Sequence, residues 1–162
     1  MKQHDIKAER AINGNNFYIM PFGAFTSANL SGEIIALLTP VLAAAAPLFG
    51  GDAIKGNDIS LLDIDAEAAA PILSNAAAGL SGDKLEALLK KLLVRYKNIT
   101  VAVDGESEAQ WLTEDLANEL FCGETQDLFI LAIEVIKVNY AGFFKKLGGQ
   151  SGKLINALMA KV

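Results

Sequence analysis

The sequence has one histidine and one cysteine, so it is poor in the residues on which much enzyme chemistry depends. His4 lies in a charged N-terminal stretch where fraying is expected, and we assign it no catalytic or metal-binding role. Cys122 stands between a phenylalanine and a glycine with no histidine nearby, which favours a buried, inert thiol over a nucleophile. We therefore predict that the protein is not an enzyme and holds no metal or cofactor.

Basic residues are also scarce, since 14 lysines and arginines against 19 acidic residues give a net charge of −5. The cations are scattered, whereas nucleic-acid binding requires clustered lysine and arginine. A single cysteine cannot form an internal disulfide, which is typical of a reducing cytoplasm. We expect a cytoplasmic protein that does not bind nucleic acid.

Long hydrophobic runs are limited to residues 34–49, "IIALLTPVLAAAAPLF". This run has 16 residues and two prolines, whereas a membrane-spanning helix needs about 20 apolar residues. We therefore expect a buried helix here and no membrane association. The charged opening "MKQHDIKAER" predicts that no secretory signal is present.

Two short segments predict a small antiparallel sheet. Residues 5–20 contain "NGNN" between two short runs, and an Asn-Gly pair in that position is a strong hairpin signal. Residues 98–104, "NITVAVD", alternate apolar and polar side chains like a strand. Because a lone strand leaves its hydrogen bonds unmade, we expect it to pair with the hairpin.

The first half of the remaining chain is predicted to be helical. A helix is expected from about Leu30 towards Phe49, capped by Ser27 or Asn29. A second helix is expected to start near Asp63, and Pro71 is expected to break it early.

Three later segments complete the helical prediction. The leucine stripe of "LSGDKLEALLKKLLVRY" predicts an amphipathic helix that Ser81 caps. Thr113 is a suitable start for a short helix, and a long helix begins at Glu124 or Thr125. That last helix is apolar on most sides, which predicts a central position. The fold class is therefore α+β, mainly α: a helical bundle around an apolar C-terminal helix, with a small antiparallel sheet. We expect one globular domain over residues 1–148 and a Gly-hinged tail over residues 149–162.

Aromatic residues gather in the last third of the chain. For Trp111, Phe121 and Phe129 we expect burial around the last helix.

Phe143 and Phe144 are different, because neighbours on a helix point about 100° apart. Both rings are buried only if the chain packs around this end or bends there; otherwise they dock a partner. The helix is already apolar on most sides, so we predict that Phe143, Phe144, Leu147 and Tyr140 form a protein-binding surface and that the chain self-associates.

The order of these features resembles the tail assembly chaperones of long-tailed bacteriophages and prophages. A hairpin segment "AINGNNFYIMPFGA" precedes "LLTPVL", and a leucine-rich helix leads into "LLVRYKNITV". The segment "WLTEDLANELFCGE" and a helix closing with "VNYAGFF" follow, so the resemblance covers roughly residues 5–147.

The resemblance implies a non-enzymatic role in virion assembly. Such chaperones bind the tape measure protein in the host bacterial cytoplasm and help to recruit tail tube protein around it. Two other functions remain open from the residues alone. One is a structural phage tail or head-completion protein, and the other is a small membrane-active, holin-like protein that uses residues 34–49 as a span.

Overall fold

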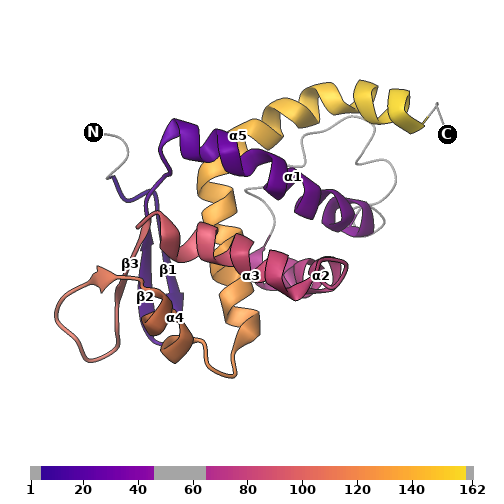
Figure 1. Cartoon of the computed structure of the whole chain (residues 1–162). Coiled ribbons are helices and arrows are strands. Elements are labelled where there is room, and N and C mark those ends of the chain that lie inside the picture. The colour runs from indigo at the N-terminus through magenta and orange to yellow at the C-terminus, as the bar shows by residue number, and fades with distance from the viewer. Residues whose placement is uncertain (1–4, 46–64, 160–162) are drawn as a thin grey trace.

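The fold is described from a computed structural model that covers residues 5–45 and 65–159, without the side chains of residues 37–45, 72, 73, 76, 77 and 143–159. Within these residues the protein is mainly helical, with a small antiparallel sheet of order β1-β2-β3-β4. The predicted α+β class is therefore confirmed. In Figure 1 the sheet lies to one side, and the first half of helix α5 stands between the sheet and helix α2.

The hairpin forms where the sequence predicts it. Strand β1 (Ala8–Ile12) pairs antiparallel with β2 (Asn15–Ile19) around Asn13 and Gly14, which have φ angles of 50° and 80°. A two-residue turn with positive φ at both positions matches the right-handed twist of the strands, which explains the Asn-Gly pair.

The predicted third strand is confirmed, and a fourth strand extends the sheet. Strand β3 (Ile99–Ala102) pairs antiparallel with β2, and the two-residue strand β4 (Gln110–Trp111) pairs with β3. Directly opposed residues lie on the same face of a sheet, so Phe17 and Val101 share the face that is fully buried. Trp111 is opposite Thr100, on the other face.

Helix α1 (Ala24–Ala45) begins six residues earlier than predicted. Ser27 and Asn29 therefore lie inside its first turns, and the prediction that one of them caps the helix is wrong. Leu30 and Ile34 form its buried face. The predicted end near Phe49 lies outside the described residues.

Helix α2 (Ala66–Ala77) is not broken by proline as predicted. Pro71 lies inside the helix, which continues for six further residues. The helix begins after Asp65, whose Oδ1 accepts a hydrogen bond from the Glu67 N–H at 3.2 Å. Asp65 thus satisfies one of the N–H groups that a helix start leaves free.

The leucine-rich helix consists of α3 (Gly82–Lys90) and a turn of π-helix, η4 (Lys91–Arg95). Helix α4 (Glu114–Leu120) begins after Thr113, whose hydroxyl oxygen accepts a hydrogen bond from the Leu116 N–H at 3.2 Å. The predicted start at Thr113 is therefore confirmed. Ser81 occupies the corresponding position before α3, but its side chain makes no capping hydrogen bond.

Helix α5 (Thr125–Met159) packs against α2, η4 and both hairpin strands. Its first half is central, as predicted, because the side chains of Leu131, Val135 and Ile136 are almost fully buried. The helix bends about half-way along, and its second half runs beyond the sheet (Figure 1). It continues through Gly148 and Gly149, where the sequence predicts a hinge; the division into a domain and a tail stays a prediction.

Ion pairs and an aromatic contact connect the sheet to the helices around one core. The guanidinium group of Arg10 on β1 contacts the carboxylate of Glu67 on α2 and lies 3.7 Å from that of Glu134 on α5. Phe17 stacks on Phe121 with ring centroids 5.6 Å apart.

Within the described residues, no helix combines the length and the apolar character that crossing a bilayer requires.

Candidate functional site

The residues predicted to bind a partner all lie on α5, and the structure describes the side chain of one of them. Tyr140 is buried, with 4% of its surface exposed, and its hydroxyl donates to the Ser27 carbonyl oxygen at 2.8 Å. Burial raises the pKa of Tyr140, so the hydroxyl stays protonated and able to donate at neutral pH. The side chains of Phe143, Phe144 and Leu147 lie outside the described residues, and the binding role of all four stays a prediction.

Tyr140 and its neighbour Asn139 fix the start of helix α1 to helix α5. The Asn139 Oδ1 accepts a hydrogen bond from the Phe22 N–H at 2.7 Å, and its Nδ2 donates to the Val135 carbonyl oxygen at 2.9 Å. Together with the bond from Tyr140 to Ser27, these contacts hold both ends of residues 22–27. The position of this segment is therefore set from the middle of α5.

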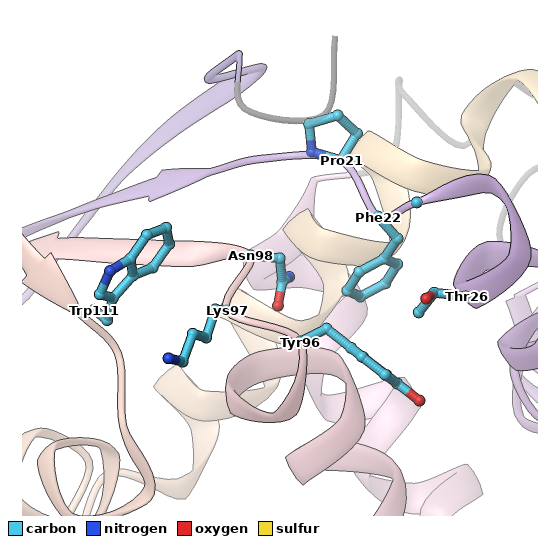
Figure 2. Close-up of a pocket in the computed structure, with 8 residues that line it drawn as sticks. Pro21, Phe22, Thr26, Tyr96, Lys97, Asn98 and Trp111 are labelled. Carbon is cyan, nitrogen blue, oxygen red and sulfur yellow. The ribbon is translucent and has the colours of Figure 1, made fainter. Parts of the chain in front are cut away.

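A hollow of ≈ 250 Å³ opens where this segment meets the sheet. Figure 2 shows that its walls come from three parts of the chain: residues 21–26, the turn 96–98 and Trp111. The Phe22 and Tyr96 rings meet edge to face, with centroids 5.8 Å apart at an interplanar angle of 74°. With Trp111, three of the eight residues that line the hollow are aromatic.

The polar groups of the hollow are few and distinct. Asn98 is 3% exposed; its Nδ2 donates to the Leu92 carbonyl oxygen at 3.0 Å. Its Oδ1 is buried and has no hydrogen-bond partner among the described residues. Lys97 is the one charged residue among the lining residues, and it is exposed, with a φ of 49°.

The first turn of α1 also borders the hollow, through Gly23 and Thr26. The first N–H of this helix that bonds back to a carbonyl oxygen is that of Ser27, which bonds to Gly23. Glycine has no side chain that could cap the preceding N–H groups. The hollow therefore receives the positive end of a helix dipole in addition to the lysine.

Trp111 contradicts the prediction that it belongs to the core. Its surface is 43% exposed, because β4 is a two-residue edge strand that presents Trp111 away from the buried face. The neighbouring Leu112 is buried in its place, at 1% exposure. The predictions for Phe121 and Phe129 are confirmed, at 7% and 5% exposure.

Cys122 is exposed, so the prediction of a buried thiol is wrong. Phe121, the residue before it, takes the buried position at the end of α4 and leaves Cys122 on the solvent side of the turn. Among the described residues no histidine, cysteine and carboxylate groups gather in a way that could hold a metal ion.

The hollow was not predicted from the sequence, because its walls are brought together from distant parts of the chain. Two signals were present: the aromatic pair in "PFGAF", residues 21–25, and the single tryptophan. Phe25 of that pair is 93% exposed, the most exposed large apolar residue that the structure describes. A hollow with aromatic side chains in its walls can bind apolar groups of another molecule.

The chain was compared with known proteins. Residues 13–152, well over half of the chain, match the family model described as "Phage tail assembly chaperone protein, TAC". No curated protein and no solved structure matches the chain. The match confirms the family indicated by the order of sequence features. The protein belongs to the phage tail assembly chaperone family.

Proposed function

We propose that the protein binds the tape measure protein of its phage or prophage and helps to recruit tail tube protein around it, without enzymatic activity, in the host bacterial cytoplasm. The observation that carries this proposal is the family match over residues 13–152. In the same proposal the chain self-associates while it holds its client.

The described surface supports a role in holding an apolar client. Phe25 and Trp111 are exposed at 93% and 43%, which is unusual for aromatic side chains that serve only the core. Exposed apolar groups are the contacts that an apolar client requires. The net charge of −5 favours solubility while such groups are exposed.

The second half of α5 is the proposed client-binding surface. It carries Phe143, Phe144 and Leu147, and in Figure 1 it extends beyond the sheet. Tyr140 is buried where this half begins, so we assign it the role of anchoring the surface to α1.

The double substitution Phe143→Ala, Phe144→Ala tests this proposal. The protein is co-expressed with the tape measure protein encoded in the same phage genome, and the amount recovered in a pull-down is measured beside the melting temperature. Truncating interface anchors is expected to weaken binding by about 2 kcal/mol or more while the melting temperature changes little. Ile35→Ala, which truncates an apolar side chain of α1 that is 37% exposed, is the control and is expected to leave the pull-down unchanged.

Two results would contradict the proposal at different levels. A large loss of melting temperature in the double variant makes the pair part of the core, because truncating a buried phenylalanine costs about 3–5 kcal/mol. Absence of any complex between the unaltered chain and the tape measure protein contradicts the client itself. Recruitment of tail tube protein is measured separately, by adding that protein to the purified complex.

A further inference from the structure

We propose that the hollow between residues 21–26, the turn 96–98 and Trp111 is a second docking site, which binds a peptide segment of the client that carries an aliphatic or aromatic side chain next to a carboxylate. This inference rests on the proposed function only for the identity of the client. It concerns a surface separate from the second half of α5.

The walls select an apolar side chain. Phe22 and Tyr96 supply aromatic surface on one side of the hollow and Trp111 on the other (Figure 2). At ≈ 250 Å³ the hollow is smaller than the roughly 300–1,000 Å³ that is usual for cofactors and drug-sized ligands. It suits one large side chain together with the adjoining backbone.

Two groups at the hollow favour a carboxylate beside that side chain. Lys97 forms no ion pair with the described residues, and no aspartate or glutamate lines the hollow. The first turn of α1 adds N–H groups that no side chain of Gly23 can cap. A helix start that no Gly23 side chain can cap, beside a lysine without an ion pair among the described residues, attracts an anion. Such a positive site contrasts with the net charge of −5 of the chain.

The buried Asn98 Oδ1 favours a peptide over a simple anion. It is an acceptor without a donor among the described residues, and its side chain lies among those that line the hollow (Figure 2). A buried acceptor without a partner is destabilising, and because less than 1 Å² of this oxygen is exposed, an occupant's N–H group removes the penalty only when the lining side chains move to admit it. A peptide presents a backbone N–H next to its side chain, and a free anion such as phosphate does not.

Trp111 makes the site directly measurable, because it is the only tryptophan of the chain. The full-length protein is titrated with the blocked peptide acetyl-Gly-Asp-Phe-Gly-amide while tryptophan fluorescence is recorded. We expect a saturable change, and a weaker response to the two matched peptides in which Asn replaces Asp or Ala replaces Phe.

The substitution Lys97→Gln separates the charge from the fold. It is expected to lower the affinity for the Asp peptide by about two- to fivefold, as an exposed ion pair does, and to leave the affinity for the Asn peptide unchanged. Lys84→Gln is the control, since Lys84 is an exposed cation in the first turn of α3, at the far end of that helix from the turn 96–98. It is expected to bind all three peptides like the unaltered chain.

Several outcomes overturn the inference. They are an unsaturable response at millimolar peptide, equal affinities of the Lys97→Gln and unaltered proteins for the Asp peptide, and a concentration-dependent change of fluorescence without peptide. The last outcome would show that a second copy occupies the hollow. If the peptides bind as expected but the tape measure protein is not captured, the hollow stands and the proposed client is wrong. If the tape measure protein is captured equally by the Lys97→Gln protein, the client stands and the hollow is not its site.

Discussion

Single residues decide the helix starts, and the two predicted caps show how far a residue type alone can be trusted. Thr113 and Ser81 both precede a helix in extended backbone geometry, as the sequence predicts. Only the Thr113 hydroxyl accepts a hydrogen bond from its helix. The sequence indicates that a hydroxyl is in place but not which rotamer it adopts, because the rotamer depends on packing around the helix start.

This difference predicts unequal effects of two matched substitutions. Thr113→Ala leaves the Leu116 N–H without its acceptor and is expected to lower the free energy of unfolding by about 1 kcal/mol. Ser81→Ala removes no side-chain capping bond and is expected to change it by about 0.5 kcal/mol or less. Urea unfolding at 25 °C measures both variants. Equal losses would contradict the capping geometry.

At the scale of elements, the sequence predicts local regularity well and long-range support poorly. The hairpin and β3 follow from an Asn-Gly turn and from alternating side chains, both of which are local signals. The early start of α1 is not local, because Asn139 and Tyr140 hold it across more than a hundred residues. The exposed position of Trp111 likewise depends on β4 being an edge strand. The two residues of β4 are too few to show the alternation of apolar and polar side chains that marks a strand.

Helices α3 and α4 are linked by Lys90, whose Nζ lies 2.6 Å from a Glu86 carboxylate oxygen and 2.7 Å from one of Glu114. The hydrogen bonds that Lys90 donates to Glu114 and Glu86 raise the pKa of Lys90, and the bond donated to Glu86 lowers the pKa of that carboxyl group. A carboxyl group with a lowered pKa stabilises the fold at pH values above its ordinary pKa. This contribution to stability is lost as the pH falls through the lowered pKa. Because these groups are exposed, the contribution to stability is small.

The Lys90→Met substitution tests this link through the pKa and not through stability. Removing the ammonium group is expected to return the pKa of Glu86 towards its ordinary value of 4.5. An NMR titration of the Glu86 carboxyl carbon measures the change. Lys84→Met, two residues from Glu86 on the same helix, is expected to leave the pKa where it is. An unchanged pKa in the Lys90→Met protein would contradict the ion pair.

For the whole molecule, the buried cluster indicates which part of the chain carries the fold. Its described members extend from Ile12 to Tyr140 and come from the sheet and from the helices. The predicted domain over residues 1–148 contains all of them. Phe25 and Trp111, two exposed aromatic residues that the structure describes, lie outside this cluster. The sequence assigned Phe121 and Phe129 to the core correctly and Trp111 wrongly, because the exposure of Trp111 depends on an edge strand that pairs across the sheet.

Removal of residues 149–162 tests the predicted domain over residues 1–148. The shortened chain keeps every described member of the buried cluster, so we expect it to melt in one cooperative transition within about 2–4 °C of the full chain, the shift that about 1 kcal/mol produces in a domain of roughly 150 residues. Removal of the last turns of α5 is expected to affect binding more than folding. The proposed binding residues Phe143, Phe144 and Leu147 remain, but they then lie at the end of the helix, without the turns that follow them in the full chain. Scanning calorimetry of both chains, followed by the tape measure pull-down, measures the two effects separately. A shortened chain that unfolds far below this range would show that residues 149–162 belong to the folded domain, and the boundary at residue 148 would then be wrong.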